Sequence, residues 1–136
     1  MAEGNSELIF KQECFEIVGA CFDVYKGMGS GFLEAVYQEC LGIEFANRRI
    51  PFVPTPELRL SYPGRLLNQT YFPDFLCYEQ IIVELKAVTG LANEHRAQAI
   101  NYLRATNLQL AILVNFGHQP KLEYERLVLT KKSDSQ

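Results

Sequence analysis

Apolar residues recur three and four positions apart at two places in the first third of the chain. This spacing puts them on one face of a helix, so we expect a first helix over about residues 6–26 and a second over 32–47. The glycine-rich stretch 27–31 separates the two, because glycine adopts the irregular and left-handed turns that end helices. The apolar stripe of the first helix consists of Phe10, Cys14, Ile17, Val18, Cys21 and Tyr25, and that of the second consists of Leu33, Val36, Tyr37, Cys40 and Leu41.

The pattern changes to alternation after the second helix. Prolines at positions 51, 54 and 56 exclude a helix there, because proline lacks the amide hydrogen that a helix needs. Short alternating or wholly apolar runs then predict strands. Asn93 is a good N-cap for a third helix over 94–105. The expected strands span about residues 57–62, 69–77, 81–87, 108–116 and 124–129.

This order of elements, α-α-β-β-β-α-β-β, predicts a mixed sheet. The third strand, the helix after it and the fourth strand form a β-α-β unit, which should be a right-handed crossover with parallel strands. The earlier strands are joined by short turns and should be antiparallel. We therefore expect an α/β (α+β) fold, a mixed β-sheet flanked by helices, in a single domain over 1–136. Its core should cover about 6–129, with loose tails at 1–5 and 131–136.

The hairpin formed by the second and third expected strands carries the candidate chemistry. Its sequence is PDFLCYEQIIVELK, residues 73–86. Side chains alternate between the faces of a strand, so Glu84 and Lys86 share a face. A turn of three residues would put Asp74 opposite Glu84 on that face, whereas a turn of two would make Asp74 point away. The hypothesis of a shared site therefore requires a turn with an odd number of residues or a bulge.

Two adjacent carboxylates and an amine favour a specific chemistry. The carboxylates of Asp74 and Glu84 would repel each other unless a cation lay between them, and oxygen ligands of this kind suit Mg²⁺ or Mn²⁺. The cation would lower the pKa of a bound water, and the Lys86 amine could orient that water or neutralise developing charge. Taken alone, E-x-K is also typical of a half-exposed strand with surface charges. Three side chains on one face of the third helix could reach the same cleft: His95, Gln98 and Tyr102.

Composition and charge narrow the function classes. With 136 residues, 48% of them hydrophobic, the chain is long enough for one core. Its net charge of −3 does not indicate nucleic-acid binding, which usually shows as a basic domain or stripe. Some arginines could still contribute phosphate contacts, although we interpret most of them as scattered surface charge. They are Arg48, Arg49, Arg59, Arg65, Arg96 and Arg104.

Nothing in the sequence indicates export or a membrane. The opening stretch, MAEGNSELIF, lacks the basic and apolar segments of a signal peptide, and the chain has no run of about 18 apolar residues to span a membrane. The four cysteines form no C-x-x-C pair, which argues against a zinc knuckle. We expect a reduced, cytoplasmic protein.

Together these elements and side chains resemble the PD-(D/E)XK nuclease superfamily, whose restriction-endonuclease-like core has the order α-β-β-β-α-β. The resemblance covers about residues 6–129. The stretch GFLEAVY, residues 31–37, is similar to the G-x-x-E-x-x-Y signature of the bacterial GxxExxY family, which is named after it. Further matches follow in the same order, with VELKA at 83–87, QAINYLRAT at 98–106 and LVNFG at 113–117.

The resemblance implies roles for individual residues. Asp74 and Glu84 would bind Mg²⁺ or Mn²⁺, and Lys86 would be the catalytic lysine. Glu34 would be a further metal ligand or would orient water; the alternative for Glu34 is a solvated helix residue. Gln98 would support the site or contact a phosphate.

These features lead to one main hypothesis and two alternatives. The main hypothesis is a metal-dependent nuclease that hydrolyses phosphodiester bonds in DNA, with a homodimer or a targeting partner left open. The second is a fold retained as a non-catalytic nucleic-acid- or protein-binding module, which the excess of 16 acidic over 13 basic side chains favours. The third is a different hydrolase, but no Ser-His-Asp order, glycine-rich phosphate loop or histidine metal motif supports it. RNA as substrate, and endo- or exonuclease action, stay open at this stage.

Overall fold

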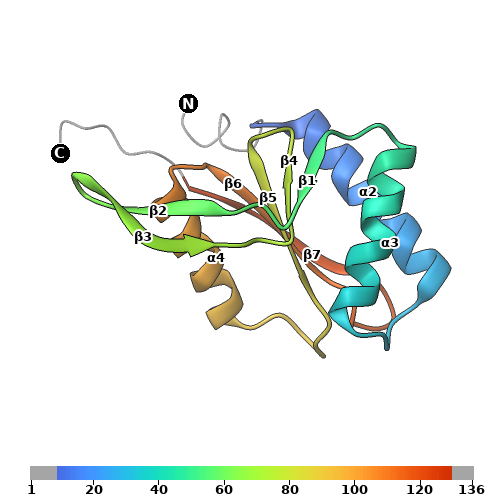
Figure 1. Cartoon of the computed structure of the whole chain (residues 1–136). Coiled ribbons are helices and arrows are strands. Elements are labelled where there is room, and N and C mark those ends of the chain that lie inside the picture. Colours follow the sequence, from blue (N-terminus) through green and yellow to red (C-terminus); the bar gives the residue numbers. More distant parts are fainter. Residues whose placement is uncertain (1–8, 130–136) are drawn as a thin grey trace.

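The computed structural model describes residues 9–129, so the expected tails at 1–5 and 131–136 lie outside the described part of the chain. The helices are α2 (Lys11–Met28), α3 (Glu34–Asn47) and α4 (Asn93–Thr106). The strands are β1 (Phe52–Pro54), β2 (Leu58–Tyr62), β3 (Arg65–Tyr71), β4 (Phe75–Cys77), β5 (Ile81–Lys86), β6 (Leu110–Asn115) and β7 (Glu123–Val128). Figure 1 shows α2 and α3 lying together at one end of the molecule.

Five of the strands form a mixed sheet in the order β1-β4-β5-β6-β7. β5 and β6 are parallel and are connected through α4, whereas every other neighbouring pair in this sheet is antiparallel. β2 and β3 pair with each other as a separate antiparallel hairpin, which extends away from the main sheet (Figure 1). The predicted mixed sheet flanked by helices, with a parallel β-α-β unit, is therefore confirmed.

The side chains of β5 divide between two hydrophobic clusters on opposite faces of the sheet. Ile81, Val83 and Leu85 belong to the larger cluster, which also contains residues of α2, α3, β4 and β6. Ile82 belongs to a smaller cluster formed with α4 and the β2–β3 hairpin. The alternation of side chains along a strand separates the two sets. α2 and α3 therefore cover one face, and α4 and the hairpin cover the other.

The strand expected over 69–77 is broken into two strands. β3 ends at Tyr71 and β4 begins at Phe75, with Pro73 in the break. Proline has no amide hydrogen to donate to a neighbouring strand, so it interrupts a ladder. β3 then pairs with β2, whereas β4 pairs with β1 and β5. The break thus assigns the two halves of the expected strand to different sheets.

The proline-rich stretch after α3 contains a strand that the sequence pattern did not predict. β1 pairs with β4 at the edge of the main sheet, with Pro54 opposite Phe75. An edge strand tolerates proline because one of its sides makes no ladder hydrogen bonds. The prolines exclude a helix, as expected, without excluding a short edge strand.

All three described helices start at a residue other than the one expected, and α3 begins at Glu34, two residues after the expected start. α2 begins at Lys11, several residues later than expected, because Phe10 takes a left-handed conformation with φ 53°; residues 6–8 lie outside the described part. α4 begins at Asn93, which makes Ala92 the N-cap in place of Asn93. Among the described residues, no helix is long and apolar enough to cross a membrane.

Candidate active site

The turn between β4 and β5 has three residues, 78–80. Phe75 pairs with Val83 in the ladder, so the same register places Asp74 opposite Glu84, one position beyond the last pair. Opposite residues of an antiparallel pair project to the same face of the sheet. The turn therefore has the odd length that a shared site requires.

Asp74 is fixed by hydrogen bonds to its backbone and to its side chain. Its Oδ2 accepts the N–H of Leu85 at 2.8 Å. Its carbonyl oxygen accepts the N–H of Thr55 at 2.9 Å and the Nε2 amide of Gln38, on α3, at 3.2 Å. Its own N–H donates to Glu84 Oε1 at 3.3 Å. These bonds hold the Asp74 carboxylate against Glu84, and no described residue donates a hydrogen bond to Asp74 Oδ1.

Glu84 is partly buried beside this carboxylate. Burial raises the pKa of Glu84 to about 7, and the negative charge of Asp74 adds to the rise. The Tyr71 hydroxyl opposes the rise in pKa, because it donates a hydrogen bond to Glu84 Oε2 and so favours the ionised form. A cation between the two carboxylates would relieve their repulsion and part of the cost of burial.

Tyr71 connects this pair of carboxylates to the helix behind it. It is the last residue of β3 and is buried, and its ring stacks on the ring of Tyr102 from α4 with centroids 3.8 Å apart. Burial and the charge of Glu84 raise the pKa of Tyr71, so its hydroxyl stays protonated and continues to donate. The hydroxyl position is therefore set by ring stacking as well as by the hydrogen bond.

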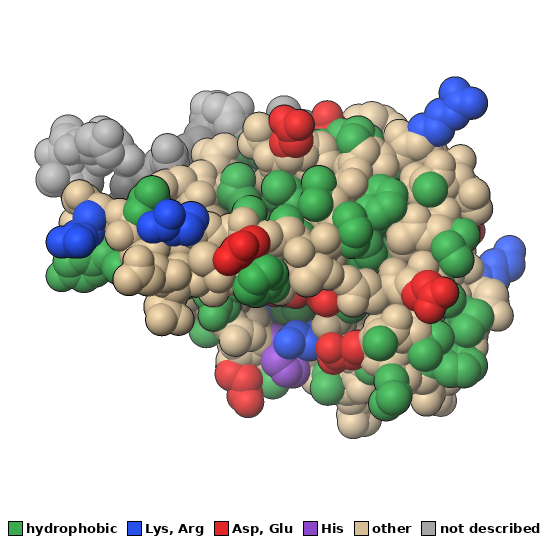
Figure 2. All heavy atoms as spheres, viewed as in Figure 1, with side chains coloured by type: hydrophobic (Ala, Val, Ile, Leu, Met, Phe, Trp, Pro, Cys, Tyr) green, Lys and Arg blue, Asp and Glu red, His purple; other side chains and the backbone are tan. Residues whose placement is uncertain are grey.

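Lys86, His95 and Gln98 line one small cavity together with Glu84. Lys86 is the last residue of β5 and shares a face with Glu84, and the other two project from α4. His95 Nδ1 accepts the N–H of Ala92 at 3.0 Å, so a neutral ring carries its proton on Nε2. Figure 2 shows acidic, basic and histidine side chains together at a hollow between the α4 and α3 regions.

The backbone on either side of Lys86 is held by the end of β6. The Lys86 carbonyl oxygen accepts the N–H of Phe116 at 2.8 Å. The buried Asn115 side chain accepts, on its Oδ1, the N–H groups of Val88 and Gly117, each at 3.0 Å. A Cβ atom on Gly117 would lie 2.4 Å from the Val88 carbonyl oxygen, so only glycine fits there without a backbone shift. Lys86 is thus positioned by a close contact between two chain segments.

Glu34 lies one helical turn from a residue that contacts the site. It is the first residue of α3 and is exposed. Gln38 follows four residues later on the same face, about 6 Å along the helix axis, and donates to the Asp74 carbonyl. Within residues 9–129, no hydrogen bond or ion pair engages the Glu34 carboxylate. The structure brings Asp74, Glu84, Lys86 and Gln98 together, and within residues 9–129 it gives the exposed Glu34 carboxylate no hydrogen bond to any of them.

The first and last residues of the GFLEAVY stretch, Gly31 and Tyr37, have structural roles. Tyr37 is fully buried, and its hydroxyl donates to the Gly29 carbonyl at 2.5 Å and accepts the Phe32 N–H at 3.2 Å. Its ring stacks on Phe116 with centroids 4.5 Å apart. Gly31 has φ 111°, a conformation that side chains other than glycine rarely adopt. These residues hold the start of α3 in place.

The donor set suits a small divalent cation that keeps part of its water shell. Within residues 9–129, no three His, Cys, Asp or Glu side chains are grouped so that they could hold a metal ion. Mg²⁺ needs no such group, because it commonly binds through one or two carboxylates and retains several waters. Asp74 and Glu84 supply two carboxylates. The residues present therefore fit a hydrated Mg²⁺ or Mn²⁺ better than a metal enclosed by protein ligands.

Two residues that shape the site were not predicted from the sequence, Tyr71 and Gln38. In a continuous strand Tyr71 and Asp74, three positions apart, would point to opposite faces. The break at Pro73 removes that restriction and lets both face Glu84. A usable signal existed only for Gln38, because its position four residues after Glu34 puts both on one helix face.

Comparisons with known proteins extend these observations. A profile of the PD-(D/E)XK nuclease superfamily matches residues 11–127. No curated protein matches the sequence. Among solved structures, the crystal structure of SSO0001 is similar, with a TM-score of 0.56 and 14% sequence identity over 72% of this chain and 50% of that one. This chain thus spans about half the length of SSO0001, and at this identity the likeness concerns the fold alone.

Proposed function

This chain belongs to the PD-(D/E)XK nuclease superfamily, and we propose that it is a metal-dependent nuclease that hydrolyses phosphodiester bonds in DNA. The observation that carries the proposal is the pair of facing carboxylates, Asp74 and Glu84, with Lys86 beside them in the same cavity. The GFLEAVY stretch supports a finer assignment to the GxxExxY family within the superfamily.

Each site residue has a role that its surroundings support. Asp74 and Glu84 would hold Mg²⁺ or Mn²⁺, which would supply a water of lowered pKa and stabilise charge on the phosphate. Lys86 orients the attacking water and offsets negative charge that develops on the phosphate oxygens. Gln98, at the same cavity, contacts a phosphate or supports Lys86. Glu34, exposed at the start of α3, would be a further metal ligand or would orient water.

The proposed nuclease needs some means of choosing its substrate. A chain of 136 residues has little surface for reading base sequence. We therefore favour recognition of DNA structure or of strand ends, either by this domain alone, by a homodimer or with a targeting partner.

A non-catalytic binding module is the second candidate, and two observations favour it. The net charge of −3 opposes strong binding of nucleic acid over the whole surface. The Tyr71 hydroxyl and the Asp74 N–H also already donate to the two oxygens of Glu84. Against it, a binding module has no reason to keep two facing carboxylates on a hairpin whose strand residues are mostly buried.

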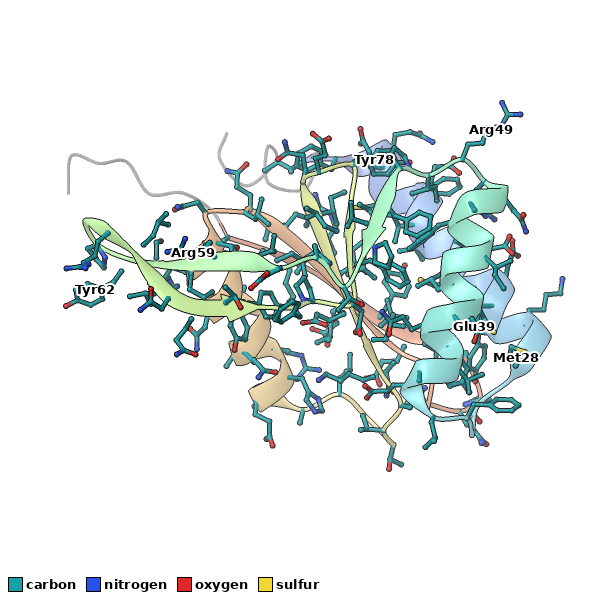
Figure 3. The ribbon with its side chains drawn as sticks, viewed as in Figure 1. Met28, Glu39, Arg49, Arg59, Tyr62 and Tyr78 are labelled. Carbon is teal, nitrogen blue, oxygen red and sulfur yellow. The ribbon has the colours of Figure 1, made fainter. Side chains whose placement is uncertain are left out.

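A cleavage assay with matched variants separates these two functions. The assay compares wild type, Asp74→Asn and Lys86→Ala in the presence of Mg²⁺ or Mn²⁺. The substrates are linear, nicked, branched and single-stranded DNA, and RNA. We expect a loss of about 10³-fold for Asp74→Asn and about 10²-fold for Lys86→Ala, the scale of losing one group that acts in the transition state. Glu39→Gln is the control, because Glu39 is an exposed carboxylate on α3 (Figure 3).

Metal titration by calorimetry completes the test. If wild type cleaves nothing and binds Mn²⁺ no better than Asp74→Asn, the binding-module function replaces the nuclease. If Asp74→Asn cleaves as fast as wild type, the proposed site is wrong even though the protein is a nuclease. Asparagine keeps an oxygen to accept the Leu85 N–H, so this variant should remain folded.

A further inference from the structure

The β2–β3 hairpin is a part of the fold that the carboxylate site does not use. Its base packs into the smaller hydrophobic cluster through Leu58, Leu60 and Tyr71. Ser61 Oγ also donates to the Ala105 carbonyl of α4 at 3.1 Å. The turn at the other end projects away from the main sheet (Figure 1). The hairpin thus packs against α4 as far as Ser61, whereas the turn and its flanks, residues 62–66, are exposed to solvent.

The hairpin is basic although the protein is acidic. Residues 58–71 contain two arginines, Arg59 and Arg65, and no acidic residue. The whole chain, by contrast, has 16 acidic and 13 basic side chains. One acidic residue, Glu57, precedes β2 at the base. Arg104 of α4 adds a third cation beside the hairpin, in a surface cavity that it shares with Ser61.

These arginines differ from others in the protein in what surrounds them. Arg48 and Arg96 are each paired with carboxylates at 2.5–3.7 Å. Within residues 9–129, no carboxylate lies within ion-pair distance of Arg59, Arg65 or Arg104. The Nε–H of Arg59 donates to the Leu67 carbonyl of β3 at 2.8 Å, so part of this guanidinium stabilises the hairpin itself. Of these three, Arg104 donates to Asn101 Oδ1 at 3.4 Å, and Arg65, at the tip, makes no side-chain hydrogen bond within residues 9–129.

The tip places an aromatic ring beside that cation. Tyr62 and Arg65 are opposite each other in the ladder, so their side chains share one face. Pro63 and Gly64, with φ 91° at the glycine, form the turn between them. Tyr62 is 65% exposed, and Figure 3 shows it at the far end of the hairpin, away from the body. An exposed ring next to an unpaired guanidinium is the combination that stacks on an unpaired base and binds the adjoining phosphate.

We propose that the β2–β3 hairpin is an arm that binds an unpaired stretch of nucleic acid, with Tyr62 stacking on a base and Arg65 contacting a phosphate. The identification of that strand as the substrate rests on the proposed nuclease function. β3 runs from the tip to Tyr71, whose hydroxyl contacts Glu84. Its 7 residues span about 20 Å, or about six nucleotides at the spacing of a B-form strand. The arm holds the strand at that distance from the carboxylates.

Binding measurements without a divalent metal test the arm independently of cleavage. The probes are fluorescent oligothymidine and oligouridine strands of about 20 nucleotides, longer than the arm's reach, and a DNA duplex of equal length. The variants are Tyr62→Ala, Tyr62→Phe and Arg65→Gln. Arg49→Gln is the charge-matched control, because Arg49 is exposed beyond the end of α3, far from the hairpin (Figure 3). Thermal unfolding verifies that each variant is folded.

We expect Tyr62→Ala to weaken single-strand binding by about 5- to 100-fold and Tyr62→Phe to change it little, because stacking needs the ring but not the hydroxyl. Arg65→Gln should lower the slope of log K against log salt by about 0.7, the value for one lost phosphate contact on a single strand. Arg49→Gln should leave affinity and slope unchanged. The affinities for oligothymidine and oligouridine, compared with each other, show whether the hairpin prefers DNA or RNA.

The outcomes separate the arm from the proposed function. Unchanged single-strand binding by folded Tyr62→Ala and Arg65→Gln, or no binding by wild type, would overturn the arm. Equal losses on the duplex would overturn the assignment to an unpaired strand. If the arm variants weaken binding but wild type cleaves nothing in the metal assay, the arm is supported and the nuclease function is overturned. If wild type cleaves and binds nucleic acid, and the arm variants change neither activity, the nuclease function stands and the arm is overturned.

Discussion

The two faces of β5 show how one strand serves both stability and chemistry. On the face covered by α2 and α3, Ile81, Val83 and Leu85 are at most 2% exposed and join the larger hydrophobic cluster. On the other face, burial decreases from Ile82 to Glu84 and the side chains become ionisable. The first face fixes the backbone. The second carries groups whose own interactions are unfavourable, as the raised pKa of Glu84 shows.

This difference teaches that the site depends on the opposite face for its geometry. Two like charges brought together oppose folding, so the surrounding packing must hold them in place. Variants on the first face should therefore change stability and leave site chemistry intact in the folded fraction. Variants on the second should change chemistry, and some should make the protein more stable.

The largest expected effect on stability comes from Phe45→Ala, in the part of α3 that packs into the larger hydrophobic cluster. Phe45 is fully buried, and its ring lies 5.1 Å from that of Phe75 and 5.5 Å from that of Phe52. Its truncation should cost about 3–5 kcal/mol of the free energy of unfolding, measured by urea titration. Phe15→Ala is the control, because Phe15 is 71% exposed and should cost less than about 0.5 kcal/mol. Equal effects of the two variants would contradict the assignment of the core.

An intermediate effect of opposite sign is expected for Glu84→Gln. The pKa of Glu84 is raised from 4.5 to about 7, so between these pH values the folded protein binds more protons than the unfolded chain. Wild-type stability should therefore fall as pH rises through this window, and glutamine, which does not ionise, should abolish that fall. From about pH 4.5 to 8 without metal, the variant should gain about 2–3 kcal/mol of stability relative to wild type.

Urea unfolding at about pH 4.5, 6 and 8 measures this difference. Added Mn²⁺ should stabilise wild type and have little effect on Glu84→Gln, because the variant lacks one carboxylate. Glu39→Gln should follow the wild-type pH profile. If the Glu84→Gln and wild-type curves remain parallel from acid to alkaline pH, Glu84 is an ordinary surface carboxylate.

The smallest expected effect is that of Tyr71→Phe. Loss of the hydroxyl removes the hydrogen bond that favours ionised Glu84, so the pKa of Glu84 should rise further. Apparent Mn²⁺ affinity at about pH 7 should fall a few-fold and recover at higher pH, since protons then compete less. Calorimetric titration at two pH values measures this. Tyr102→Phe keeps the stacked ring and should behave as wild type; an identical loss in both variants would assign the effect to packing.

The sequence predicted the elements whose burial repeats regularly. The helices, the β4–β5 hairpin and the β5-α4-β6 crossover follow from spacing, because periodic apolar residues report which face is buried. β1 was missed because three residues at a sheet edge carry no period. The division between β3 and β4 was missed because Pro73 lies in an otherwise strand-like run, and one proline does not show which sheet each half joins.

The candidate site was predictable only in part, because periodicity shows which face of a strand a residue occupies but not how separate elements meet. The shared face of Glu84 and Lys86 follows from alternation, but the position of Asp74 depends on the length of the turn, which the pattern left open. Tyr71 reaches Glu84 only because the strand breaks after it. The contact of Gln38 with the Asp74 backbone depends on how α3 packs, a tertiary property that local spacing does not contain.

Gly117 has a consequence for how substitutions in this protein will be interpreted. It has no room for a Cβ against Val88, and the segment it packs on leads directly from Lys86. In a saturation library screened for activity, substitutions at Gly117 should be eliminated almost as strictly as those at the carboxylates. Substitutions at the exposed hairpin turn should survive and alter substrate choice. Depletion in such a screen would thus mark Gly117 as functional although it contacts none of the reacting groups.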